Sequence, residues 1–130
     1  MSTRNKILIT GAAGFLRGKR ATTHWAYCDL LSDCGAQYEK ARFVRDGNIF
    51  TGGGVTAGID FAFALALELY GNDIAQSLQL GLEYDPAPPL DYGHPDKADP
   101  HIHQKLTERY AQPVTDTRSA LLSRTALFKD

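Results

Sequence analysis

The stretch KILITGAAGFLRGKRATTHW, residues 6–25, supports two interpretations, and the choice between them decides the fold. Its first half is typical of a nucleotide-binding Rossmann protein, in which a strand over Lys6–Thr10 runs into a turn formed by Gly11 and Gly14. Its second half is typical of a helix end, a basic turn and a short buried strand over Ala21–His24. The first interpretation predicts a phosphate cradle, and the second predicts a histidine delivered at the end of a strand.

The Rossmann interpretation fits the sequence poorly. The dinucleotide fingerprint needs three glycines, and Arg17 occupies the third position, where close helix–strand packing favours a small residue. A βαβ crossover needs about 10–12 residues or more, and only residues 11–19 separate the first expected strand from the next. No acidic residue follows a second strand at the distance that binds a ribose. We therefore prefer a packed strand or helix with small residues at a contact.

Composition limits the class of protein. The chain has 130 residues, of which 43% are hydrophobic, and a net charge of −1, which predicts one soluble globular domain with no nucleic-acid partner. No apolar run is long enough to span a membrane. Two cysteines, Cys28 and Cys34, are typical of a cytosolic protein with free thiols rather than of a disulfide scaffold. We therefore expect a cytoplasmic location and no membrane partner.

Strands and helices alternate through the middle of the sequence. Residues 25–33 predict a helix that ends at Gly35. Asp46-Gly47 predicts a hairpin turn between residues 43–44 and 49–50. Residues 56–70 are apolar nearly all round and predict a buried helix that ends at Gly71. Alternating strands and helices indicate an α/β layered fold.

The remainder of the chain is expected to be helical apart from one extended segment. Residues 72–84 predict an amphipathic helix with Asn72 as the N-cap. The Pro- and Asp-rich residues 85–100 predict an extended surface segment. Residues 101–112 and 114–128 predict two weaker helices, the second with Thr115 or Asp116 near its start. We expect a single domain over residues 1–130, with a divergent helical tail from residue 91.

Three strings carry a resemblance to a known family: GAAGFLRGKRATTHWAYCDLL, RFVRDGNIFTGGGVTAGIDFAFALALEL and QLGLEYDPAPP. In order and spacing they resemble the second half of the ThiJ/PfpI superfamily domain, and within it the isonitrile hydratase-like group, over about residues 11–90. The resemblance implies an α/β fold, namely the C-terminal half of a flavodoxin-like (class I glutamine amidotransferase-like) α/β sandwich. That family is usually dimeric.

The same resemblance implies a nucleophile elbow whose helix ends in residues 11–19, which assigns Gly11 and Gly14 to helix packing. The family pattern places its cysteine near Arg4, where this sequence reads MSTRNK. The acidic residue that the family draws from its first half has no counterpart either. The resemblance therefore predicts a truncated domain with a different start, inactive alone. The full domain would hydrate an isonitrile to an N-substituted formamide with no cofactor or metal.

The family also suggests the site residues. Its strand-end histidine lies near the nucleophile, which makes His24 the candidate catalytic residue, although a histidine that only caps a strand end is the alternative. The loop before the next helix borders the pocket in the family, where its backbone N–H groups could hold an anion; tight strand-to-helix packing is the alternative. The residues expected to form this pocket loop are Thr23, Gly52, Gly53, Gly54 and Thr56.

Two other sets of side chains invite a functional interpretation. Cys28 and Cys34 follow the Thr-His-Trp string on a helical stretch rather than an elbow, so we interpret them as structural thiols. His94, His101 and His103 lie close together in sequence, but no cysteine or second pair supports a zinc site. We expect neither a metal nor a cofactor.

The sequence leaves three functions open. The first is a truncated isonitrile hydratase-like protein, inactive alone or completed by a partner. The second is a non-catalytic interaction or ligand-binding module that reuses the glycine-rich loop and binds a small molecule. The third is a short nucleotide-binding protein. Half of the family domain has no counterpart here, so we expect a homo-oligomer or a complementing N-terminal half to cover the exposed strands and the apolar helix.

Overall fold

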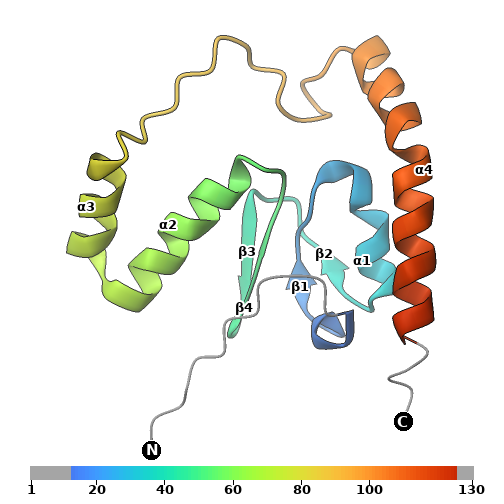
Figure 1. Cartoon of the computed structure of the whole chain (residues 1–130), viewed down its shortest axis with the longest axis horizontal. Coiled ribbons are helices and arrows are strands. Elements are labelled where there is room, and N and C mark those ends of the chain that lie inside the picture. The colour runs from blue at the N-terminus through green and yellow to red at the C-terminus, as the bar shows by residue number, and fades with distance from the viewer. Residues whose placement is uncertain (1–12, 126–130) are drawn as a thin grey trace, which may run out of the picture.

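The computed structural model describes residues 13–125 of the chain (Figure 1). The first expected strand, Lys6–Thr10, and the turn residue Gly11 lie outside the described residues. The described chain begins with a short 3-10 helix, η1 (Ala13–Leu16), and turns at Gly18, which has a φ of 72°. A helical end followed by a turn is what the resemblance implied for residues 11–19.

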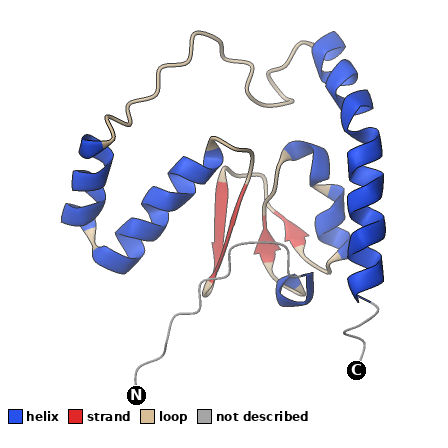
Figure 2. Ribbon diagram, in the orientation of Figure 1, coloured by secondary structure: helices blue, strands red, loops and turns tan. Residues whose placement is uncertain are grey.

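Four short strands form two small sheets in the middle of the molecule (Figure 2). Strand β1 (Arg20–Ala21) pairs in parallel with β2 (Gln37–Tyr38), and β3 (Phe43–Asp46) pairs antiparallel with β4 (Ile49–Gly52). Helices α2 and α3 lie on one side of the strands, and α1 and α4 lie on the other (Figure 1). The expected layering of helices around strands is confirmed.

The hairpin formed by β3 and β4 is also confirmed. Asp46 pairs with Ile49, and Gly47 occupies the turn with a φ of 64°, a conformation that side chains other than glycine rarely adopt. The two sheets are joined by side chains, because the N–H of Arg20 donates to Asp46 Oδ2 at 2.8 Å and the N–H of Thr22 donates to Thr51 Oγ1 at 2.9 Å.

The strand expected over Ala21–His24 is shorter than predicted. Strand β1 ends at Ala21, because Thr22 bonds side chains and loop carbonyls instead of a strand; its hydroxyl donates to the Ala41 carbonyl at 2.9 Å. His24 is the N-cap of a 3-10 turn, η2 (Trp25–Tyr27), and helix α1 (Asp29–Asp33) follows. Gly35, with a φ of 72°, follows this helix as expected.

Helix α2 (Ala57–Tyr70) ends at Gly71 as predicted, but it is not buried. Only Ala57 is fully covered, and Leu67 is 51% exposed. The sequence pattern showed an apolar helix, and the described chain supplies packing partners for only part of its surface. Helix α3 (Asn72–Gly81) starts one position earlier than predicted: its N-cap is Gly71, with Asn72 as the first helical residue.

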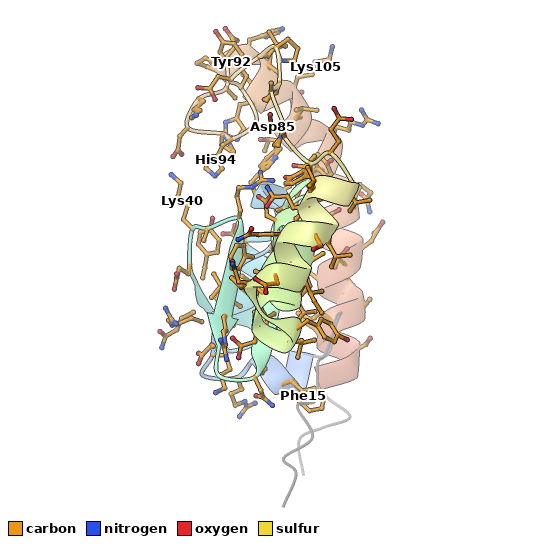
Figure 3. The ribbon with its side chains drawn as sticks, turned by 90° about the vertical axis from the view of Figure 1, so that its left-hand side faces the viewer. Phe15, Lys40, Asp85, Tyr92, His94 and Lys105 are labelled. Atoms are coloured by element: carbon orange, nitrogen blue, oxygen red, sulfur yellow. The ribbon has the colours of Figure 1, made fainter. Side chains whose placement is uncertain are left out.

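Residues 82–99 contain no helix or strand, as expected for the extended segment. One ion pair lies within this segment, with Lys97 Nζ 2.6 Å from Asp91 Oδ1. A second pair, between Lys40 and Asp96, joins the segment to the residues that follow β2. Figure 3 shows Lys40 close to His94 at the edge of the sheet. The segment runs from α3 to α4 beyond the upper ends of the strands in the view of Figure 1.

Residues 100–125 form one continuous helix, α4 (Pro100–Thr125), where the sequence predicted two. Pro113 lies inside it, and Thr115 does not start a second helix, because its hydroxyl donates to the Ala111 carbonyl one turn earlier at 2.9 Å. An interior proline removes one helical hydrogen bond and disfavours a helix, yet α4 continues through this position. No helix within residues 13–125 is long and apolar enough to cross a membrane.

The core of the described chain is small. Ala21, Leu31 and Ala36 are buried together, with Leu16 packed against them. This core lies between the first sheet and α1. Helix α2 and the glycine loop lie outside this cluster.

Candidate functional site

His24 is held by the backbone of the turn that it begins. Its Nδ1 accepts a hydrogen bond from the N–H of Ala26 at 3.3 Å. An accepting Nδ1 carries no proton, so the neutral ring has its proton on Nε2. On the edge of the ring that faces away from the turn, His24 therefore carries an N–H donor rather than a lone pair.

Aromatic rings surround the imidazole. The centroid of the His24 ring lies 5.3 Å from Trp25, 6.0 Å from Tyr27 and 5.2 Å from Tyr110. Burial among these rings lowers the pKa of His24 below 6.5, because a charged imidazole is poorly solvated there. His24 is consequently neutral at pH 7.

The glycine-rich loop lies against His24 and Thr23. A Cβ built on Gly54 would lie 3.3 Å from His24 Cδ2, and a Cβ built on Gly53 would lie 3.4 Å from the Arg42 carbonyl oxygen and 3.7 Å from that of Thr23. A side chain at Gly54 would crowd the imidazole, whereas a Cβ at Gly53 would only touch the two carbonyl oxygens. Cδ2 neighbours Nε2 in the ring, so the proton-bearing edge of His24 lies on the loop side.

The loop also presents unused backbone donors. The N–H of Gly53 is bonded to the Arg42 carbonyl at 2.9 Å, and the N–H of Ala57 is bonded to the Gly54 carbonyl at 2.9 Å. Between them, the N–H groups of Gly54, Val55 and Thr56 donate to no acceptor within residues 13–125. Three consecutive donors at the start of α2 form an arrangement that favours an anion.

The structure brings four of the six predicted site residues together and places two at the margin. Thr23, His24, Gly53 and Gly54 lie in contact distance of one another. Gly52 ends β4, and a Cβ on it would face Phe61 at 3.8 Å rather than His24. Thr56 is the N-cap of α2, and its Oγ1 accepts from Arg42 Nη2 at 3.4 Å.

Arg42 orders the loop, and its role was not predicted from the sequence. Its carbonyl fixes Gly53, and its guanidinium pairs with Asp60 in the first turn of α2. The Tyr84 hydroxyl donates to the other oxygen of Asp60. Burial raises the pKa of Asp60, but the bonds from Tyr84 and Arg42 outweigh burial and hold that pKa below its usual value.

The two cysteines lie away from the glycine loop. Cys28 Sγ donates to the His24 carbonyl at 3.7 Å, and the contact with Cys28 raises the pKa of Tyr38 to about 12. Burial, together with the charge of Asp33, raises the pKa of the Cys34 thiol. A raised thiol pKa opposes thiolate formation, so Cys34 has the chemistry of a structural thiol.

The three histidines near the start of α4 do not converge. Within the described part of the chain, no three His, Cys, Asp or Glu side chains could hold a metal ion. His103 instead packs edge-on against Trp25, with ring centroids 5.2 Å apart. Both rings line a mostly apolar groove of about 550 Å³ under the extended segment, together with Leu90, Tyr92, Ile102 and Leu106.

Tyr110 is the second contributor that sequence reasoning missed. It lies on α4, in the part of the chain interpreted as a divergent tail, yet its ring contacts His24. A signal was available, since His103, Leu106 and Tyr110 recur at helical spacing and therefore share one face of α4. What the spacing could not indicate is which part of the molecule that face meets.

Comparisons with known proteins agree on one family. The model of the DJ-1/PfpI family matches residues 6–68. The chain is 57% identical over 119 residues to isonitrile hydratase from Pseudomonas putida, covering 92% of this chain and 52% of that protein. It is 36% identical over 70 residues to the HTH-type transcriptional regulator GlxA from Rhizobium meliloti (strain 1021), covering 52% of this chain and 22% of that protein.

A solved structure agrees with these sequence matches. A ThiJ/PfpI family protein from Pseudomonas syringae superposes with a TM-score of 0.77 at 42% identity, covering 83% of this chain and 44% of that protein. The chain thus spans about half the length of the isonitrile hydratase and of this structural relative. The similarity to the isonitrile hydratase extends over most of α4, beyond the region where the sequence strings were first noted.

Proposed function

The chain belongs to the DJ-1/PfpI family, and on that premise we propose that it supplies the histidine and glycine-loop half of an isonitrile hydratase-like active site. The nucleophile of that site would come from outside these 130 residues, whose cysteines, Cys28 and Cys34, both lie off the loop. The observation that carries the proposal is the edge of His24 next to Gly54, beside three unused N–H groups. Both cysteines are free thiols, which suits a reducing, cytoplasmic compartment.

The proposed reaction adds water across an isonitrile. An external thiolate attacks the terminal carbon and forms a C–S bond, and the carbon then takes a proton to give a thioimidate. Water adds to the same carbon, the C–S bond breaks, and the thiolate leaves with an N-substituted formamide as the product. Neutral His24 relays a proton between water and the reacting carbon, so the imidazole is neutral before and after the step. The N–H groups of Gly54, Val55 and Thr56 stabilise developing negative charge.

A chimera tests this proposal. The matching half of the Pseudomonas putida isonitrile hydratase would be replaced by this chain, so that the rest of that enzyme supplies the remainder of the site. We expect the chimera to produce formamide, and His24→Ala to lower kcat by about a hundredfold or more, the usual contribution of a general acid or base. His101→Ala, on the exposed side of α4, is the matched control and should stay within about twofold.

Two results would contradict the proposal. One is a folded chimera whose formamide production is unaffected by His24→Ala. The other is hydratase activity in the isolated 130-residue chain that disappears with Cys28→Ala, which would make Cys28 the nucleophile. A chimera that binds isonitrile without turnover would favour the ligand-binding module over the enzyme.

A further inference from the structure

We propose that Tyr110 of α4 is a positioning residue for His24, holding the face of the imidazole so that its Nε2 edge stays against the glycine loop. Helix α4 would then be part of the site rather than a tail. The catalytic consequence rests on the function proposed above, whereas the positioning itself does not.

Tyr110 is placed where it can hold the histidine. Trp25 and Tyr27 belong to the same short turn as His24 and move with it, so they cannot fix the turn in place. Tyr110 comes from a distant element and contacts all three rings: its centroid lies 5.2 Å from His24, 5.6 Å from Trp25 and 6.0 Å from Tyr27. The last two contacts are edge-on, the geometry that aromatic pairs prefer.

Contacts on both sides of Tyr110 hold α4 in register. Toward the N-terminus of the helix, His103 packs on Trp25 with centroids 5.2 Å apart. Toward the C-terminus, Arg118 Nε donates to Asp33 Oδ2 of α1 at 2.8 Å. Two contacts, one on each side of Tyr110, fix the position of its ring relative to His24. Figure 1 shows α4 running alongside α1.

The ring of Tyr110, rather than its hydroxyl, makes these contacts. Within residues 13–125 the Tyr110 hydroxyl has no hydrogen-bond partner, so phenylalanine should replace tyrosine without loss. The titratable groups around His24 are Tyr27 and Tyr110 at its ring and the Cys28 thiol at its carbonyl. Burial is the cause of the lowered pKa of His24, so removing the Tyr110 ring acts on His24 mainly through exposure to water.

Nuclear magnetic resonance of the imidazole nitrogens tests the positioning in the 130-residue chain. His24→Gln assigns the His24 signals among the four histidines. We expect Tyr110→Ala to raise the pKa of His24 toward its ordinary value and to mix the two neutral tautomers, whereas Tyr110→Phe should keep both as in the parent chain. Tyr70→Ala, an exposed tyrosine at the end of α2, is the matched control.

The proposal is overturned if Tyr110→Ala leaves the His24 titration and tautomer unchanged, or if Tyr110→Phe disturbs them as much as alanine does. Should Tyr110→Ala fail to fold, Tyr110→Leu keeps most of the apolar volume without the ring, and the same comparison with phenylalanine decides the question. In the chimera, Tyr110→Ala should lower kcat about ten- to a hundredfold with KM little changed. An inactive chimera would count against the proposed function alone, because the resonance experiment needs no turnover.

Discussion

His24 and Gly54 fit together with no space for an added methyl group. A Cβ at Gly54 would lie 3.3 Å from His24 Cδ2, which is closer than carbon atoms normally pack. The ring cannot move away freely, since Ala26 bonds its Nδ1 and Tyr110 lies within stacking distance. A glycine at position 54 is therefore needed for the His24 ring to keep its position, as well as for the conformation of the loop.

We expect Gly54→Ala to lower the free energy of unfolding by about 1 kcal/mol, the lower end of the cost of overpacking, and to displace the His24 ring. Gly58→Ala is the control, because a Cβ at Gly58 would meet nothing within 4 Å and the residue lies in α2. Alanine in a helix should stabilise by about 0.5–1 kcal/mol. Urea unfolding of both variants measures the difference, and equal effects at the two glycines would contradict the close fit.

At the scale of elements, Asp60 joins three parts of the chain. Its carboxylate bonds Arg42 before β3 and Tyr84 after α3, while its backbone belongs to the first turn of α2. Since Arg42 also fixes Gly53, the same carboxylate indirectly orders the loop beside His24. A carboxylate in the first turn of a helix also suits the helix dipole, but the position in the sequence does not show these two partners.

We expect Asp60→Asn to lower the free energy of unfolding at pH 7 by about 1–2 kcal/mol, since a charged partner is lost from two hydrogen bonds. The folded-state pKa of Asp60 lies below its usual value of 3.8, so its stabilisation is fully present above pH 3.8 and is lost as the pH falls through the lowered pKa.

The difference between wild type and Asp60→Asn should therefore shrink in acid, as measured by urea unfolding from pH 7 to pH 2. The control is Asp73→Asn, which changes a carboxylate in the first turn of α3 that has no side-chain partner among residues 13–125. A loss at Asp73 as large as that at Asp60 would mean that the helix dipole, rather than the Arg42 and Tyr84 bonds, explains the effect.

At the scale of the molecule, the described chain exposes several large apolar side chains on α2 and α3. Helix α3 is amphipathic, yet the described chain covers only about half of Ile74 and Leu78 and less of several other large apolar side chains of α3 and of the end of α2. The most exposed of these side chains are Leu80 at 83%, Leu82 at 70%, Tyr70 at 65%, Leu67 at 51% and Ile74 at 49%. Surfaces of this kind mark an interface or an aggregation site.

We expect the chain to self-associate, or to bind a complementing half-domain, through the α2 and α3 surface. Light scattering should give a mass above that of the monomer, and Leu80→Glu with Leu82→Glu should return it to the monomer. Gln76→Glu, on the same helix, adds charge without removing apolar surface and serves as the control. If the parent chain is a monomer that unfolds in one sharp thermal transition, the prediction of self-association or of a complementing half-domain is wrong.

Elements governed by local chemistry were predictable from the sequence. The Asp46-Gly47 turn and the helix end at Gly71 follow from glycine's access to positive φ, and the amphipathic α3 follows from its repeat of apolar residues. The family was recognisable for a similar reason, since strings such as RATTHWAYCDLL retain their order and spacing. His24 and the glycine loop could be named from those strings alone.

Only the tertiary structure decided what depends on residues far apart in the chain. The exposure of α2 depends on which neighbours are present, and the sequence shows only that the helix is apolar. The continuity of α4 through Pro113 and the contact of Tyr110 with His24 depend on where that helix packs. The residues therefore determined the chemistry that is available, and packing determined which groups meet, because an interaction between distant residues leaves no periodic pattern along the sequence.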